Sequence, residues 1–185
     1  MTLRRFVLTG QPGAGKTTLL AELAGRGQRT VPEAATDLIA EGHRRGVSEP
    51  EREPDFLARV VELQVARQRA ATEGDLWFFD RSPLCTLALA RHLDRPAPPV
   101  LRAELGRIVT EHVYQPVVFF LEPPAELVNT PIRRIDPAGA REFGRLHVTV
   151  YERYGFVLHR IPVLPTAERA DRVLAAASPT KSGEI

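Results

Sequence analysis

The clearest chemical signal in the sequence is a glycine-rich loop at residues 10–17, with the letters GQPGAGKT. It fulfils the pattern G-x-x-x-x-G-K-[ST], in which a curled loop turns backbone N–H groups toward phosphate oxygens before a helix begins. In this pattern Lys16 would reach the β- and γ-phosphates, and the Thr17 hydroxyl would bind Mg²⁺. An ordinary glycine turn is the alternative. We predict a site for ATP or another nucleoside triphosphate with Mg²⁺, formed by Gly10, Gly13, Ala14, Gly15, Lys16, Thr17 and Thr18.

A second candidate lies at the end of the apolar run 76–79, where Asp80, Arg81 and Ser82 follow in order. If this run is a parallel strand, its carboxyl end faces the crevice in which such sheets bind ligands. Asp80 could hold Mg²⁺ directly or through water, and Arg81 could contact phosphate or substrate. Alternatively, Asp80 caps the helix expected after Pro83, a position that Ser82 could also fill. We favour the metal role because the glycine loop requires a partner for its metal.

Glu33 is a candidate for proton transfer, since it follows a short segment, 30–32, that could be the second strand. It would then lie near the same edge of the sheet as the glycine loop. There its carboxylate could accept the proton of an acceptor hydroxyl, which is the general-base role in phosphoryl transfer. The alternative is a first-turn helix acid, stabilised by the helix dipole. Spacing alone leaves both readings open.

Three polar residues of the expected helix 56–71 are candidates for an acceptor site, together with Glu33 and Arg81. They are Gln64, Arg67 and Gln68. Helical spacing places them on the polar side of this helix, where they could line a pocket for the acceptor. The alternative, which the spacing favours, is a solvated helix face.

An arginine-rich segment at about 129–145, with prolines near both ends of its first part, separates the last two expected strands. We predict a lid in which Arg133 and Arg134 take part in catalysis, and in which Arg133 and Arg141 contact the nucleotide. The planar fork of arginine grips phosphate oxygens and keeps its charge. A lid that excludes water also favours transfer to an acceptor over hydrolysis. The alternative is a solvated charge cluster paired with local carboxylates.

Composition excludes several other classes of function. The formal net charge is only +2, which does not suggest a nucleic-acid binder. The 25 basic residues include two lysines, Lys16 and Lys181, and the letters TKSG around Lys181 do not form the [NT]-K-x-D motif of guanine recognition.

One cysteine, Cys85, cannot form an internal disulfide, so a reducing compartment is expected. Because no apolar run reaches the ~18–20 residues of a membrane span, we expect a cytoplasmic protein.

These candidates must be positioned by short apolar runs that alternate with segments of helical periodicity. The expected strands are 6–9, 30–32, 76–79, 117–121 and 156–163, and the expected helices are 16–24, 56–71, one after Pro83, 100–112 and 164–177. Such alternation predicts an α/β fold, with a parallel sheet covered by helices on both faces. We expect a single domain, 1–177, and a loose tail, 178–185.

Five segments in this order carry a resemblance: 10–17, VPEA at 31–34, FDRS at 79–82, RRIDP at 133–137 and YGF at 154–156. They resemble the small AAA-domain ATP-binding proteins related to the ribosylnicotinamide kinase domain of the bacterial NAD regulator. Deoxyribonucleoside and thymidylate kinases are more distantly similar. The resemblance spans about residues 3–174.

This resemblance implies a three-layer P-loop NTPase fold: a five-stranded parallel sheet in the order 2-3-1-4-5, helices on both faces, and a lid between the last two strands. It also implies that Glu33 is the base and that Asp80, Arg81 and Ser82 lie at the active site. The sequence has aspartate where glutamate is more usual in this family motif. Either Asp80 or Glu33 could therefore be the base.

Together these features predict a small-molecule kinase that moves the γ-phosphoryl group of ATP to a hydroxyl of a nucleoside-like or other polar metabolite. Its partners would be a nucleotide and this acceptor, and an oligomer is possible. The alternative is a nucleotide-dependent switch or regulatory ATPase that acts through a protein partner. A mechanical ATPase is disfavoured by the small size and because Arg81 follows Asp80 where a second carboxylate would be expected.

Overall fold

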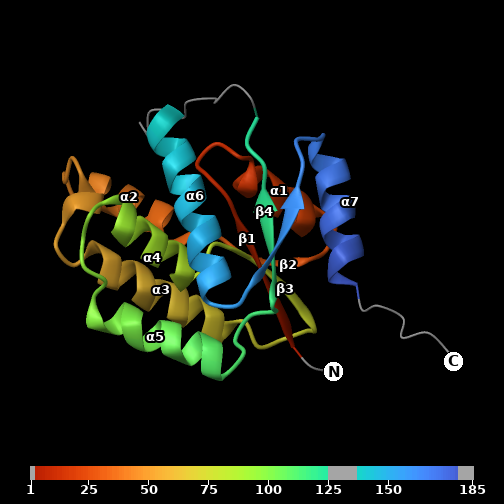
Figure 1. The fold of residues 1–185 in the computed structure, drawn as a ribbon, viewed down its shortest axis with the longest axis horizontal. Helices are drawn as coiled ribbons and strands as arrows, with labels where there is room; N and C mark the ends of the chain where they lie inside the picture. Colours follow the sequence, from red (N-terminus) through yellow and green to blue (C-terminus); the bar gives the residue numbers. More distant parts are fainter. Residues whose placement is uncertain (1–2, 125–136, 179–185) are drawn as a thin grey trace, which may run out of the picture.

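Five parallel strands form the centre of the fold, in the order β2-β3-β1-β4-β5 (Figure 1). The computed structural model describes residues 3–124 and 137–178. The strands are β1 (Arg4–Thr9), β2 (Arg29–Val31), β3 (Leu76–Asp80), β4 (Val117–Leu121) and β5 (Val157–Ile161). This confirms the predicted α/β fold class and the strand order that the resemblance implies.

Helices cover both faces of this sheet, as Figure 1 shows. They are α1 (Lys16–Gly25), α2 (Ala34–Arg44), α3 (Phe56–Ala70), α4 (Pro83–His92), α5 (Pro99–Thr110), α6 (Pro137–Arg153) and α7 (Thr166–Ala177), with a 3₁₀ turn η1 at Pro50–Arg52. Within the described ranges, no helix combines the length and the apolar character needed to cross a bilayer.

The alternation of side chains along the strands divides the core into two layers. Phe6 and Leu8 point to the face that α1 and α7 cover, where they pack in one cluster with Leu19 and Val173. Val7 points to the opposite face and belongs to the cluster built with α4, α5 and α6. A third cluster joins the apolar faces of α2 and α3 to α4. The sheet thus packs against helices on both of its faces, as a parallel sheet requires.

The register of the sheet brings the candidate residues to one edge. In the β1–β3 pair Leu8 lies opposite Asp80, and in the β2–β3 pair Val31 lies opposite Phe79. The glycine loop that follows β1, the aspartate that ends β3 and the carboxylate two residues beyond β2 therefore meet at the carboxyl end of the sheet. This is the edge at which parallel α/β sheets bind ligands.

Two helices were not predicted from the sequence. The segment 34–44 forms α2, and the segment 137–153 forms α6. The predicted lid, 129–145, thus ends within α6, which carries buried Phe143, His147 and Tyr151 at helical spacing. The first part of that lid lies outside the described residues, as does most of the expected tail, 178–185.

The approach of β4 to the start of the glycine loop supplies a test of the fold. Gly10 has φ of +134°, and a Cβ there would lie 2.7 Å from the backbone oxygen of Leu121. We expect Gly10→Ala to lower the free energy of unfolding by about 2 kcal/mol or more, because the backbone conformation and the contact are both unfavourable for alanine. Urea unfolding measures this change.

Gly106→Ala is the matched control, since Gly106 lies in α5 with open space around it. Alanine in a helix interior is favoured over glycine by about 0.5–1 kcal/mol, so this variant should be slightly more stable than the parent chain. Equal unfolding midpoints for the two variants would contradict the proposed constraint at Gly10.

Candidate active site

The glycine loop is a curled segment between β1 and α1. Gly10, Gly13 and Gly15 all have positive φ, at 134°, 81° and 86°. The ammonium of Lys16, at the first residue of α1, folds back over the loop and donates hydrogen bonds to the backbone oxygens of Gly10, at 3.3 Å, and Gln11, at 3.1 Å. This arrangement puts a positive charge and the N-terminus of a helix at one point, which favours a bound phosphate.

Two oxygen donors lie next to the loop. The Thr17 hydroxyl donates a hydrogen bond to Asp80 Oδ2 at 3.3 Å, and Asp80 is buried. A hydroxyl and a carboxylate side by side suit Mg²⁺, which takes oxygen ligands and keeps waters and substrate phosphates as the others. Among the described residues no cluster of three or more His, Cys, Asp or Glu side chains could hold a metal ion by itself.

The alternative role of Asp80 as a helix cap is not what the structure shows. Ser82 occupies the N-cap position of α4, directly before Pro83. Its hydroxyl hydrogen bonds with the hydroxyl of Tyr151 on α6, at 2.7 Å, and makes no capping bond. Asp80 instead contacts Thr17, on the loop side of the sheet edge.

Arg81 is the centre of a buried polar cluster at the same edge. Its backbone has φ of 74°, and only 6% of the residue is exposed. The guanidinium Nε lies 2.8 Å from Glu33 Oε1 in an ion pair, and Thr36 donates to the second oxygen of Glu33 at 3.0 Å. Side chains that follow β2 and β3 thus meet although 48 positions separate them in the sequence.

α6 completes this cluster through His147. Arg81 Nη1 lies 2.6 Å from His147 Nε2, and His147 Nδ1 lies 2.7 Å from the backbone oxygen of Phe143. A guanidinium only donates and a carbonyl only accepts, so Nδ1 carries the proton and Nε2 is the acceptor. The Phe143 ring lies beneath the guanidinium, whose carbon is 5.6 Å from the ring centre. The neutral tautomer of His147 is therefore the one that fits.

The pKa values of these two groups are shifted in opposite directions. Burial opposes the charge of Arg81, but the carboxylates of Glu33 and Asp80 contribute to raising its pKa above the ordinary arginine value. His147 is fully buried, and burial together with the charge of Arg81 holds its pKa well below 6.5. Arg81 is thus a permanent cation, and His147 is a neutral acceptor.

One nitrogen of this cation, Nη2, has neither a hydrogen-bond partner nor an ion-pair partner among the described residues. Nη2 of Arg81 is buried and unpartnered, and Arg81 lines a cavity of about 570 Å³. The cavity lies among α2, α3, α4 and α6. Its wall includes the apolar residues Ala35, Ile39, Phe56, Val60, Leu89, Leu93 and Phe143, and the polar residues Glu33, His43, Ser48, Glu49, Glu51, Arg52, Gln64, Arg81, Cys85, Thr86 and His92. Such a chamber has room for a small organic molecule.

The three polar residues predicted on the 56–71 helix go to different places. Gln64 is buried in the cavity wall, where its oxygen accepts a hydrogen bond from Thr86 at 2.9 Å. Gln68 is also buried, but its oxygen accepts from Arg107 of α5 at 2.6 Å and it does not line the cavity. Arg67 donates to the backbone oxygen of Pro32 at 2.9 Å. The solvated face that the spacing favoured is wrong for Gln64 and Gln68.

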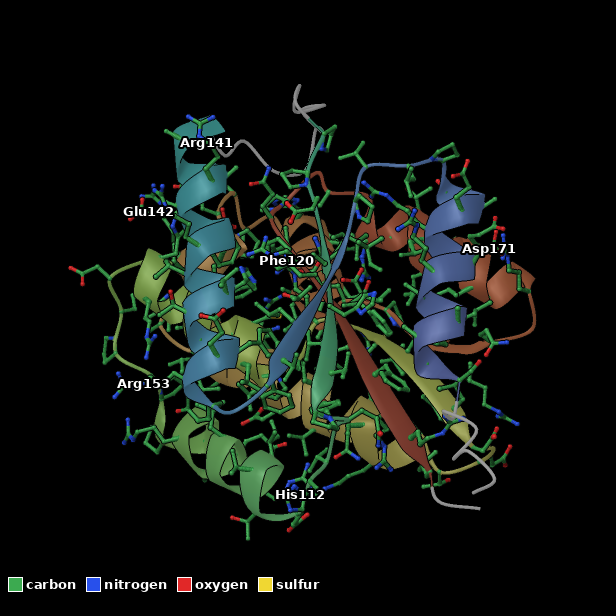
Figure 2. All side chains as sticks on the ribbon, turned by 45° about the vertical axis from the view of Figure 1, so that its right-hand side comes forward. His112, Phe120, Arg141, Glu142, Arg153 and Asp171 are labelled. Carbon is green, nitrogen blue, oxygen red and sulfur yellow. The ribbon has the colours of Figure 1, made fainter. Side chains whose placement is uncertain are left out.

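Of the three arginines predicted in the lid, Arg141 lies within the described residues. Arg141 is exposed near the N-terminal end of α6 (Figure 2). Arg133 and Arg134 lie outside the residues that the structure describes. His147 and Phe143 were not predicted from the sequence, although their spacing of four residues on α6 is the signal that indicates a shared buried face.

A family model described as an AAA domain matches residues 5–169, which is most of the chain. The chain belongs to the AAA-domain family. No curated protein sequence matches this AAA-domain chain significantly. The family and the resemblance noted from the sequence therefore agree.

Several solved structures are similar to this AAA-domain protein. A NadR protein in complex with NR superposes with a TM-score of 0.72 at 16% identity, over 99% of this chain and 54% of that chain. The chain thus spans about half the length of that NadR protein. Shikimate kinase from Acinetobacter baumannii, in complex with shikimate, gives 0.59 at 18% identity, over 95% and 93% of the two chains. Deoxyadenosine kinase from M. mycoides gives 0.61 at 13% identity, over 93% and 97%. At these identities the likeness is one of fold.

The buried His147 generates a prediction about stability and pH. Because the native pKa lies well below the unfolded value of about 6.5, the unfolded state binds more protons in the window between them, and stability falls as pH decreases through it. His147→Gln removes this titration and keeps an acceptor for Arg81. Between pH 7 and 5 the parent chain should lose stability faster than the variant, by up to about 1.4 kcal/mol per pH unit.

Urea unfolding at a series of pH values measures the two profiles. His159→Gln serves as the control for loss of a histidine, because His159 is exposed on β5. Parallel profiles for the parent chain and His147→Gln would show that the proton on His147 does not oppose the fold.

Proposed function

We propose that this protein is an ATP- and Mg²⁺-dependent phosphotransferase that moves a γ-phosphoryl group to a hydroxyl of a small metabolite. The observation that carries the proposal is the Glu33–Arg81 ion pair in the wall of the 570 Å³ cavity. Arg81 directly follows Asp80, the partner of Thr17 in the glycine loop. A proton acceptor thus lines a chamber of acceptor size, and its ion-pair partner adjoins the residue that contacts the candidate nucleotide site.

The reaction assigns a step to each group. The acceptor hydroxyl oxygen attacks the γ-phosphorus, so that a new O–P bond forms while the bond to the bridging oxygen of ADP breaks. Glu33 takes the proton that the hydroxyl loses, since a carboxylate held in an ion pair is in the form that accepts one. Arg81 stabilises negative charge that develops on the transferring oxygens. Lys16 and the backbone N–H groups of the loop hold the phosphates.

Thr17 and Asp80 would hold the Mg²⁺ ion, because their oxygen atoms already lie 3.3 Å apart beside the loop. When bound, the ion supplies positive charge that screens the phosphates from one another. We also propose that the segment 129–145 closes the site, with Arg133, Arg134 and Arg141 toward the nucleotide. The single domain over 1–177 and the cytoplasmic location expected from the sequence remain part of the same proposal.

The charges of the cavity wall support a nucleoside-like acceptor over an anionic one. Arg81 is paired with Glu33 at 2.8 Å, and Arg52 is paired with Glu49 at 3.0 Å. Each arginine in the described wall thus already has a carboxylate, so a phosphate or carboxylate of the acceptor would have to compete for it. The apolar side chains and the Gln64 amide suit a ring with hydrogen-bonding edges. Two proteins of similar fold, a NadR protein in complex with NR and a deoxyadenosine kinase, support the same class.

The alternative function, a switch or regulatory ATPase that acts through a protein partner, needs no chamber beside its nucleotide site. ATP consumption with and without a panel of hydroxyl acceptors separates the two functions. We expect consumption to rise at least about tenfold with one class of acceptor, and to vanish for every acceptor in Lys16→Ala, which lacks the phosphate-binding ammonium. Consumption that never depends on an acceptor would favour the switch.

The role of Glu33 can be tested in single turnovers. Glu33→Gln should slow phosphoryl transfer about 10²–10⁴-fold, because the amide cannot accept the proton, while the affinity for ATP changes little. Glu41→Gln is the control, since Glu41 is a half-exposed carboxylate on α2, the helix that Glu33 precedes as N-cap residue. If Glu33→Gln transfers at the parent rate, Asp80 becomes the candidate base, and the assignment made here is wrong.

A further inference from the structure

Arg169, on α7, is a buried cation that contacts the nucleotide-binding loop from behind. Only 6% of the residue is exposed. Its Nη1 donates to the backbone oxygen of Ala14, in the middle of the loop, at 2.7 Å. Nε donates to the backbone oxygen of Pro162, after β5, at 3.0 Å, and Nη2 donates to that of Glu122, after β4, at 3.1 Å. One guanidinium therefore joins the loop to the ends of two strands.

The helix that carries Arg169 is itself fixed against α1. Arg26, just past the end of α1, donates to Asp171 at 2.6 Å and to the backbone oxygen of Ala167 at 3.0 Å. Figure 1 shows α7 beside α1, and Figure 2 shows Asp171 on the side of α7 that faces α1. Because α1 begins at Lys16, the loop is held at its middle and at its end by the same pair of helices.

The charge of Arg169 lacks a counter-charge in the described part of the chain. The three hydrogen-bond acceptors are backbone oxygens, and no carboxylate forms an ion pair with it there. Burial accordingly lowers its pKa, although arginine stays protonated at neutral pH. A buried cation without an anion costs free energy, which a nearby anion would recover. The phosphates expected on the front of the loop are such an anion.

We infer that Arg169 is a positioning residue for the nucleotide phosphates. Its hydrogen bond fixes the Ala14 carbonyl, so that the N–H groups that follow in the loop face the phosphates. Its charge adds a positive potential behind the loop. This inference rests on the proposed nucleotide site. Arginine suits the position because its fork donates in three directions at once, whereas lysine offers a point charge on a flexible stem. Gly15 allows the approach, since a Cβ there would lie 3.3 Å from Arg169 Nη1.

The test measures binding of Mg²⁺-ATP and of inorganic tripolyphosphate, which has phosphates and no base. Arg169→Gln should raise both dissociation constants by the same factor, at least about tenfold. Arg169→Lys, which keeps the charge and loses the fork, should fall between this variant and the parent chain. Arg172→Gln is the matched control, because Arg172 is exposed on the same helix, and it should stay within about twofold of the parent chain.

A merely structural role has a different signature. It would lower the thermal midpoint and leave both dissociation constants unchanged at a temperature where circular dichroism shows the variant folded. That outcome overturns the inference, as does a loss of ATP affinity without a loss of tripolyphosphate affinity. If Arg169→Gln does not fold, Arg169→Lys carries the same comparison.

The outcomes also separate this inference from the proposed function. A parent chain that binds ATP but never transfers phosphate refutes the phosphotransferase and leaves the role of Arg169 standing. A parent chain that transfers phosphate while Arg169→Gln and Arg169→Lys bind both ligands normally refutes the role of Arg169 alone. A parent chain that binds neither ligand refutes both.

Discussion

The buried guanidinium of Arg81 is the constraint on which the rest of the candidate site depends. Its charge cannot remain in the interior unless other groups compensate it, and three elements of the fold supply them. The start of α2 brings Glu33, the end of β3 brings Asp80, and α6 brings His147 and Phe143. Glu33, His147 and Phe143 all contact the same cation, so the geometry of the cavity wall and the position of the proposed base are coupled.

A second buried arginine has a comparable position on the other side of the sheet edge. Arg169 is bound by backbone oxygens that follow β4 and β5 and by one within the glycine loop. Arg81, in the wall of the cavity, has carboxylates among its neighbours, whereas the three hydrogen-bond partners of Arg169 are uncharged backbone oxygens. The cation on the proposed acceptor side is therefore compensated within the protein. The cation on the proposed nucleotide side would be compensated by a bound phosphate.

The sequence was most informative where function depends on neighbouring residues. The glycine loop, Lys16 and Thr17 lie within one segment, so their pattern alone indicates phosphate binding. The three central strands, β3, β1 and β4, were also predictable, because a buried parallel strand contains a continuous apolar run. The pairing of Glu33 with Arg81 could not be derived from spacing, since it depends on which strands are adjacent and in what register.

Residues on α6 and α7 escaped prediction for a different physical reason. α6 carries many charged residues, so the buried face with Phe143 and His147 was hidden by the arginines that suggested a lid. Arg169 was not singled out from the sequence, because nothing local marks a side chain that is buried by contacts with distant loops. Gln68 was misjudged for the same reason, since its partner, Arg107, comes from another helix.

The central claim is that an acceptor hydroxyl meets the γ-phosphate beside Glu33. The most direct measurement is a crystal structure of the protein with Mg²⁺, a non-hydrolysable ATP analogue and a soaked hydroxyl acceptor. The account predicts the triphosphate on the loop 10–17 and the acceptor in the cavity, with its hydroxyl within about 3 Å of the Glu33 carboxylate. An acceptor bound outside the cavity, or with its hydroxyl turned away from Glu33 while the nucleotide is in place, would contradict it.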